Sequence, residues 1–168
     1  MGVDEHRKNT PGRIRIGVIS VSTTRSEEND ESGGWITKKA IKEGYDVVFY
    51  RVVPDDVYRI TETIRKAIHD LDPHALLLTG GTGISGKDVT IEAVRPLFEK
   101  ELSAFGTLFC QLSFEEIDSA AMLSRATAGI IGKTLVFCMP GSLKACQLAC
   151  KDLIFPELGH LVKHALEG

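Results

Sequence analysis

A glycine-rich segment and two aspartates are the residues of this sequence whose types and spacing suggest chemistry. Gly80–Asp88 reads GGTGISGKD directly after an apolar run, and Asp55 follows another apolar run in the motif VPDD. Glycines let backbone N–H groups approach phosphate oxygens, while Thr79 and Thr82 add hydroxyl donors. Carboxylates such as those of Asp55 and Asp88 are ligands that Mg²⁺ takes beside substrate phosphates and water. These residues together predict a site for a magnesium-bound phosphate ligand.

The glycine-rich segment also matches two other patterns, each with a shortcoming, and has a purely structural alternative. Gly81, Gly83 and Gly86 fit the dinucleotide pattern GxGxxG. That pattern needs an acidic residue at the end of the next strand, and Glu101 lies in a segment that we predict to be helical. The run GxxxxGK fits a P-loop, except that Asp88 stands where Ser or Thr should hold magnesium. A glycine turn that serves only the path of the chain is the third alternative.

The two aspartates have a structural alternative, which is capping of a helix N-terminus. Asp55 stands just before Asp56 and Val57, where an N-cap belongs. A crevice shared by Asp55 and Asp88 favours metal binding instead.

The elements that must position these residues are apolar, β-branched runs alternating with amphipathic helical patterns. Uninterrupted apolar runs are typical of strands covered on both faces, which favours a parallel sheet. The predicted strands are 14–21, 46–53, 75–79 and 134–139, with a shorter candidate at 125–130. The predicted helices are a segment that begins at a cap on Asp30 or Ser32 and runs to Glu43, 57–71, one from Thr90, 143–153 capped by Ser142, and 157–166. Strands joined by right-handed helical crossovers predict a three-layer α/β/α fold with a mostly parallel central sheet.

The topology also predicts where a ligand binds. Open parallel sheets bind ligands outside the carboxyl ends of their strands. The polar segments 22–31, 54–56, 80–88 and 140–142 each follow a predicted strand. We therefore expect all four to converge on one edge of the sheet.

Length and composition bound the class of protein. The chain has 168 residues, 43% of them apolar, with 20 basic against 23 acidic residues and a net charge of -3. These values predict one domain over residues 13–168 after a polar tail over 1–12, and they argue against nucleic-acid binding. No apolar run has the length of a membrane span, and the four cysteines form no CxxC pair. We expect a cytoplasmic protein with free thiols and no membrane partner.

Several motifs together resemble the MoaB/MogA family of molybdenum cofactor biosynthesis. The segments DESG, VPDD, LLTGGTG with KDVTIEA, LSRATAGIIGKT and MPGS occur in the family's order and spacing over nearly the whole chain. The runs LSFEEI and MPGSLKAC are more similar to the MoaB branch than to the MogA branch. The first loop, rich in serine and threonine before DESG, is similar to that of archaeal MoaB proteins.

This resemblance implies an adenylyltransferase that uses ATP and Mg²⁺ to convert molybdopterin to adenylyl-molybdopterin with release of pyrophosphate. The family's two functional aspartates correspond to Asp55 and Asp88, which would hold the Mg²⁺. Its substrate-binding loops correspond to Gly80, Gly81, Thr82, Gly83, Pro140, Gly141 and Ser142, with Ser20, Ser22 and Asp30 nearby. The resemblance also implies a homo-oligomer, a hexamer rather than a trimer in the MoaB branch.

Some positions depart from the family pattern. Lys87 stands where the family often has Arg, Ile91 replaces a frequent Pro, and Thr23 lies in a loop where the MogA branch carries Asp. Some bacterial MoaB proteins lack the aspartate of DVT and are not expected to catalyse this step. Asp88 is retained here, which favours activity. The alternatives are a non-catalytic, molybdopterin-binding oligomer and a P-loop-like nucleotide hydrolase or kinase.

A segment outside these motifs is rich in phenylalanine and leucine. Residues 97–114 carry four of the seven phenylalanines, spread around more than one helical face. Such a segment is either deeply buried or forms a subunit contact, and we favour the subunit interface. We expect structural roles for the pairs His160/His164 and Cys146/Cys150, and a core or interface role for Trp35.

Overall fold

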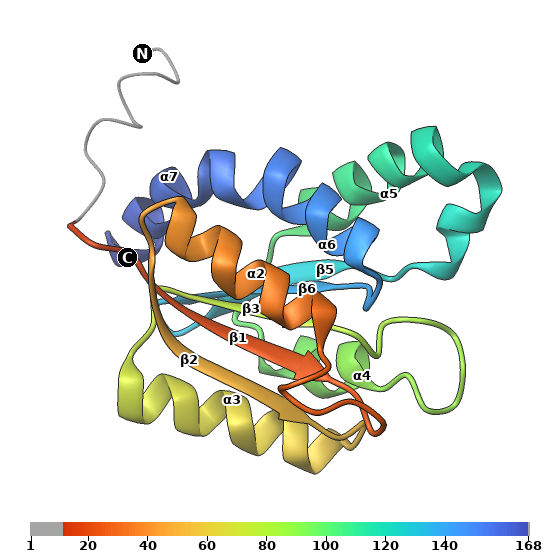
Figure 1. Ribbon diagram of the computed structural model, residues 1–168. Coiled ribbons are helices and arrows are strands. Elements are labelled where there is room, and N and C mark those ends of the chain that lie inside the picture. Colours follow the sequence, from red (N-terminus) through yellow and green to blue (C-terminus); the bar gives the residue numbers. More distant parts are fainter. Residues whose placement is uncertain (1–11, 168) are drawn as a thin grey trace.

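Residues 12–167, which the computed structural model describes, form a six-stranded sheet between two layers of helices (Figure 1). The strand order is β2-β1-β3-β6-β5-β4. The strands are β1 (Arg15–Val21), β2 (Asp46–Val53), β3 (Ala75–Thr79), β4 (Lys100–Glu101), β5 (Thr127–Ile131) and β6 (Thr134–Met139). The first four in this order are parallel, while β5 is antiparallel to both of its neighbours. The mostly parallel sheet is confirmed, and the predicted tail over residues 1–12 lies outside the described residues except for Gly12.

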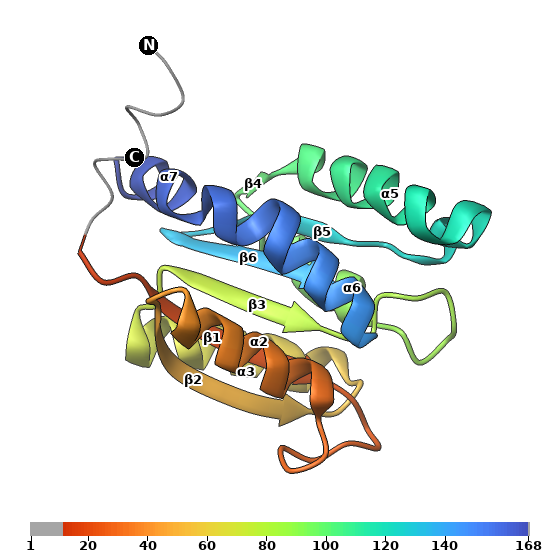
Figure 2. The same cartoon turned by 45° about the horizontal axis from the view of Figure 1, so that its top comes forward.

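Helices cover both faces of this sheet, which confirms the predicted three-layer fold (Figures 1 and 2). The helices packed on one face are α2 (Glu31–Lys42), α5 (Ser103–Ile117), α6 (Leu143–Leu148) and α7 (Phe155–Leu166). Those packed on the other face are α3 (Val57–Leu71) and α4 (Thr90–Val94). Shorter turns are the 3-10 helices η1 (Arg95–Leu97) and η2 (Asp118–Leu123) and the π-helix η3 (Ala149–Ile154).

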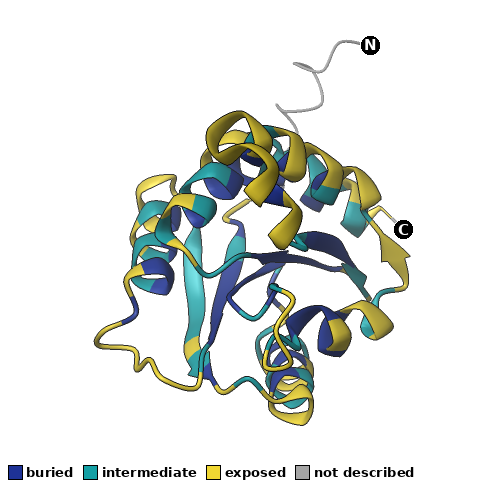
Figure 3. Cartoon of the chain, turned by 90° about the vertical axis from the view of Figure 1, so that its right-hand side faces the viewer, coloured by how far each residue is buried: buried dark blue, intermediate teal, exposed yellow. Residues whose placement is uncertain are grey.

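Each face of the sheet has its own apolar core. Val18 and Leu77 pack among the residues of α2, α5, α6 and α7, whereas Leu76 and Leu78 pack against α3 and α4. The central strands β1, β3 and β6 are therefore buried, apart from Arg15 at the start of β1, and they include the dark blue strands of Figure 3. Burial of both faces explains why these strands are apolar runs without strict alternation. A fully buried Leu contributes about 1.5–3 kcal/mol, so these side chains fix the strand positions.

Helix capping decides where the chain leaves the sheet. The Asp30 carboxylate accepts the N–H of Gly33 at 3.1 Å, so Asp30 rather than Ser32 caps α2. The Ser142 hydroxyl accepts the N–H of Ala145 at 3.2 Å and caps α6, as predicted. Such side chains satisfy N–H groups that lack partners within the helix.

Two local predictions are wrong. Glu101 lies in strand β4 and not in a helix, because backbone hydrogen bonds between residues 99–102 and β5 extend the edge of the sheet. The predicted helices 143–153 and 157–166 are one continuous helical segment through α6, η3 and α7. Pro156 does not interrupt it, because it occupies the first turn of α7 behind a π-helical turn.

The phenylalanine-rich segment divides between core and surface. Phe105 and Phe109 of α5 are buried, whereas Leu108 and Phe114 on the same helix are exposed. In the described range, Cys146 and Cys150 are buried free thiols, which confirms their structural role. No helix between residues 12 and 167 has the length and apolar character needed to cross a bilayer.

His74, before β3, generates a test of the fold. Its Nδ1 accepts the N–H of Arg15 at 2.9 Å, and burial together with the charge of Arg15 lowers its pKa below the ordinary value of 6.5. The folded state therefore binds fewer protons than the unfolded state just below pH 6.5, so its stability falls as the pH falls through this range. The variant His74→Asn keeps an acceptor but cannot titrate. Urea unfolding at pH 7.5 and 5.5 should show a smaller loss of stability in the variant than in the native protein, and equal losses would contradict this role.

Candidate functional site

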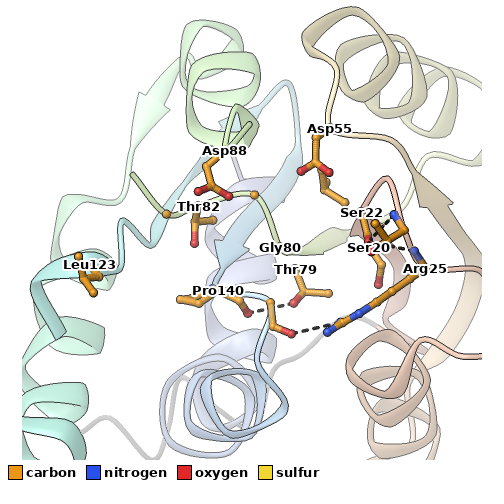
Figure 4. A pocket seen from close by; sticks show the side chains of 15 residues that line it. Ser20, Ser22, Arg25, Asp55, Thr79, Gly80, Thr82, Asp88, Leu123 and Pro140 are labelled. Carbon is orange, nitrogen blue, oxygen red and sulfur yellow. Dashed lines mark hydrogen bonds between the residues drawn. The ribbon is translucent and has the colours of Figure 1, made fainter. Parts of the chain in front are cut away.

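The loops after β1, β2, β3 and β6 enclose a pocket of about 420 Å³ (Figure 4). This volume lies in the range of small-molecule sites. The four polar segments predicted from the topology all contribute to it. The residues that line it are Ser20, Val21, Ser22, Thr24, Arg25, Asp55, Thr79, Gly80, Gly81, Thr82, Gly83, Asp88, Leu123, Pro140 and Gly141. Asp30 and Ser142 do not line it and lie behind it as helix caps.

Asp55 faces this pocket because its neighbour caps the following helix. Asp56 accepts the N–H of Arg59 at 2.8 Å and caps α3, so the capping alternative for Asp55 is wrong. The carboxylate of Asp55 is held from the first loop, where the N–H and hydroxyl of Thr23 donate to Oδ2 at 2.9 and 2.8 Å. Thr23 of the first loop thus orients Asp55.

Asp88 also faces the pocket without capping a helix. Helix α4 has Val89 at its N-cap position, with no side-chain capping bond. The N–H and hydroxyl of Ser85 donate to Oδ2 of Asp88 at 3.0 and 2.8 Å. In the described part of the chain, Oδ1 of Asp55 and Oδ1 of Asp88 accept no hydrogen bond. Figure 4 shows both carboxylates on the same side of the pocket. Each therefore has an oxygen without a partner at the pocket.

The glycine-rich loop requires glycine at two positions. Gly80 and Gly81 have φ angles of 95° and 67°, a region that residues with a Cβ rarely adopt. A Cβ on Gly80 would also overlap the carbonyl of Val21. The loop is tied to α4, since the hydroxyl and the N–H of Thr90 donate to the carbonyls of Gly80 and Gly81 at 2.8 and 3.0 Å. The loop therefore has a defined conformation at the edge of the pocket.

The loop after β6 is held by buried polar groups beneath the pocket. The hydroxyl of Thr79 donates to the carbonyl of Pro140 at 3.0 Å and lies 3.0 Å from Sγ of Cys146. The hydroxyl of Ser32 donates to the carbonyl of Gly141 at 2.8 Å. Burial raises the pKa of the Cys146 thiol to about 11, so the thiol is protonated at neutral pH and serves packing and hydrogen bonding.

The sequence interpretation missed Arg125, which holds the glycine-rich loop from outside the pocket. Its Nε donates to the carbonyls of Thr82 and Gly83 at 3.1 and 2.9 Å, and its guanidinium pairs with Glu92. The hydrogen bond from the Arg125 guanidinium to Glu92 lowers the pKa of the Glu92 carboxyl. Arg125 reaches the loop because β5 is antiparallel, so the residues before β5 lie at the carboxyl edge of β6. The signal was present in the motif LSRATAG.

Arg25 is the second functional candidate that the sequence interpretation missed. It lines the pocket, and its guanidinium donates to the carbonyl of Gly141 at 3.5 Å (Figure 4). A lone arginine in the loop before DESG was the available signal. Arg25 supplies positive charge to a pocket that otherwise carries two carboxylates.

The remaining patterns do not fit this geometry. Lys87 is exposed and does not line the pocket, unlike the lysine of a P-loop. Glu101 lies on the edge strand β4, which does not neighbour β3, so it does not complete a dinucleotide fingerprint. A larger groove of about 700 Å³ between α2 and α3 contains none of the candidate residues.

Comparison with known proteins agrees with the motifs. Residues 17–160 match a protein family described as "Probable molybdopterin binding domain". The chain belongs to this family. Its relatives at 41–45% identity include MoaB proteins, so membership of the MoaB/MogA group, predicted from the motifs, is confirmed.

Two relatives and two solved structures illustrate the family. The chain is 45% identical to molybdenum cofactor biosynthesis protein B of Bacillus cereus, over 96% of each chain. It is 42% identical to a molybdopterin adenylyltransferase of Pyrococcus furiosus, over 99% of this chain and 100% of the relative. A crystal structure of a molybdenum cofactor biosynthesis protein B superposes with a TM-score of 0.91, at 42% identity, over 95% and 100% of the two chains. The tungsten cofactor synthesizing protein MoaB from Pyrococcus furiosus superposes with a TM-score of 0.84, at 40% identity, over 92% and 98%.

The contacts of Arg125 with the glycine-rich loop can be tested by mutation. The variant Arg125→Gln removes the donors to two loop carbonyls and should lower the free energy of unfolding by about 1–2 kcal/mol. It should also speed amide hydrogen exchange across 82–88. The control Glu92→Gln keeps the bonds from Arg125 to the loop, so its effect should stay below about 1 kcal/mol, as for partly exposed ion pairs. Equal exchange in all three proteins would show that Arg125 does not hold the loop.

Proposed function

We propose that this protein acts in molybdenum or tungsten cofactor biosynthesis and adenylylates molybdopterin with ATP and Mg²⁺, releasing pyrophosphate. The observation that carries the proposal is the pair Asp55 and Asp88, each with a free oxygen beside a glycine-rich loop. The name of the Pyrococcus furiosus relative supports the same reaction. We expect the reaction to take place in the cytoplasm.

The pocket offers two carboxylate ligands to Mg²⁺. Residues 12–167 contain no cluster of three or more His, Cys, Asp or Glu side chains that could hold a metal ion. The two carboxylates would therefore share Mg²⁺ with phosphate oxygens and water, a mixed set that Mg²⁺ prefers to an all-protein cage. Bound there, Mg²⁺ would neutralise the negative charge of the reacting phosphates.

Backbone donors of the glycine-rich loop are available to bind a phosphate. The N–H of Gly80 donates to the carbonyl of Met139 at 3.0 Å. In the described range, the N–H groups of Gly81, Thr82 and Gly83 have no hydrogen-bond partner. Three successive N–H groups at a pocket can hold phosphate oxygens, as in other backbone anion sites. The contacts of Thr90 and Arg125 keep this loop in place before a ligand arrives.

The reaction needs positioning more than a protein nucleophile. A terminal phosphate oxygen of molybdopterin would attack the α-phosphorus of ATP and form a new P–O bond. The bond from the α-phosphorus to the bridging oxygen breaks, and its electron pair leaves with pyrophosphate. The attacking phosphate is already ionised at neutral pH, so no general base is required. The chain contributes alignment of the two substrates and fixed donors that offset charge.

Replacement of Asp88 tests this proposal. Asp88→Asn keeps an oxygen for the donors of Ser85 but loses the charge that holds Mg²⁺, so turnover should fall at least about 100-fold with the melting temperature unchanged. The measurement is chromatography of adenylyl-molybdopterin together with a pyrophosphate assay. The matched control is Asp56→Asn, because asparagine caps helices as well as aspartate does and should retain full activity.

Each other result of this assay has a defined meaning. Unchanged turnover in Asp88→Asn would contradict the role of Asp88. Molybdopterin binding without product in the native protein would favour the non-catalytic binding protein. ADP and phosphate formed without a pterin would favour a P-loop-like hydrolase or kinase.

We also propose a homo-oligomer, with a hexamer favoured over a trimer. The surface of α5 and η2 carries exposed apolar side chains: Leu108, Phe114, Ile117, Met122 and Leu123. Several large apolar side chains exposed on neighbouring elements are typical of subunit contacts.

Sedimentation velocity at micromolar concentration tests the oligomer. The native protein should sediment as a hexamer or a trimer, and Phe114→Glu should shift it to smaller species because a charge enters the apolar contact. The control Tyr58→Glu changes a side chain that is 70% exposed on α3 and should not alter the assembly. A native monomer would exclude this interface.

A further inference from the structure

The pocket is electrically divided between two groups of side chains. Asp55 and Asp88 lie together on one side, while the guanidinium of Arg25 extends toward Gly141 on the other (Figure 4). Among the described residues that line the pocket, Arg25 is the one positively charged side chain. Two phosphate groups, one bound to a metal and the other free of metal, would match this separation of charge.

The first loop fixes the position of Arg25. The hydroxyl of Ser22 accepts the N–H groups of Thr24 and Arg25 at 3.3 and 3.1 Å. The guanidinium lies 3.8 Å from the buried carboxylate of Asp30, and the Arg25 side chain is 45% exposed, so donors remain for a ligand. Because Thr23 in the same turn holds Asp55, one short loop sets the positions of both charges.

Ser20 is an independent sign of a ligand on this side of the pocket. It is only 3% exposed, yet its hydroxyl is the one buried side-chain polar atom in the described range without a hydrogen-bond partner. The residue lines the pocket at the end of β1. Buried hydroxyl groups in native proteins nearly always have a partner, and an orphan at a pocket points to a group supplied by a ligand.

We propose that Arg25 and Ser20 form a receptor for a phosphate monoester. The planar guanidinium donates two parallel N–H groups to phosphate oxygens, and the hydroxyl adds a third donor. Which molecule carries the bound phosphate is a further step, and that step rests on the proposed function. The triphosphate of ATP has Mg²⁺ and the glycine-rich loop to offset its charge, so Arg25 and Ser20 hold the terminal phosphate of molybdopterin.

Binding of inorganic phosphate without Mg²⁺ or ATP tests the receptor itself. Titration calorimetry of the native protein should detect phosphate, and Arg25→Gln should weaken its affinity at least about tenfold, as expected for a lost charge-assisted bond. The matched control is Arg65→Gln, an exposed arginine of α3 that does not line the pocket and should bind phosphate as the native protein does. Equal affinity in native protein and Arg25→Gln, or no phosphate binding by the native protein, overturns the proposal.

Ser20→Ala separates a ligand-binding role from a structural one. Removal of an unpaired buried hydroxyl should leave the melting temperature unchanged or raise it, while phosphate binding becomes several-fold weaker. A lower melting temperature with unchanged phosphate affinity would show that Ser20 serves the fold and would overturn its place in the receptor.

Steady-state kinetics of the native protein and Arg25→Gln test which phosphate is held. The KM for molybdopterin should rise at least about tenfold in the variant, with the KM for ATP within about twofold. A rise confined to the KM for ATP overturns the assignment to molybdopterin. If the native protein forms no adenylyl-molybdopterin, the proposed function fails, while the calorimetric titrations still decide whether Arg25 and Ser20 bind phosphate.

Discussion

The parallel pairing of β2, β1, β3 and β6 is the constraint on which the rest of the structure depends. Parallel strands end at the same edge, so every loop that follows them begins beside the others. The strand register places residues at the ends of β1, β3 and β6 side by side, since Ser20 pairs with Thr79 and Thr79 pairs with Met139. Ser20 and Thr79, which line the pocket, are thus neighbours at the ends of adjacent strands. A shift of one position in the pairing of β1 with β3 would turn Ser20 or Thr79 to the opposite face of the sheet.

Capping then separates structural carboxylates and hydroxyls from those available to a ligand. Asp30, Asp56 and Ser142 each satisfy the first turn of a helix that leaves the sheet edge. Asp55 and Asp88 lie within a few residues of helix starts but cap none, and each keeps an oxygen without a partner. Of the polar residues near these helix starts, some cap the helix and others face the pocket.

The pocket is preorganised by contacts from distant parts of the sequence. Thr23 orients Asp55 across the sheet edge, and Arg125 binds the loop that carries Asp88. These hydrogen bonds set the donors and charges before a ligand binds, which is the preorganisation that the proposed phosphoryl transfer would need. The hydroxyl of Ser20 is the opposite case, since it is buried without a hydrogen-bond partner, which costs stability in the free protein.

The sequence by itself determined the layers, the parallel strands and the edge at which the polar loops meet, because apolar runs and helical spacing are local patterns. It also identified Asp55, Asp88 and the glycine-rich loop as candidates. Only the tertiary structure decided that Asp56 is the cap beside Asp55, that β4 pairs with β5 around Glu101, and that Arg25 and Arg125 reach the site. Those outcomes depend on which distant backbone groups lie within hydrogen-bonding distance. Spacing along the chain carries no information on that distance until the strands have paired.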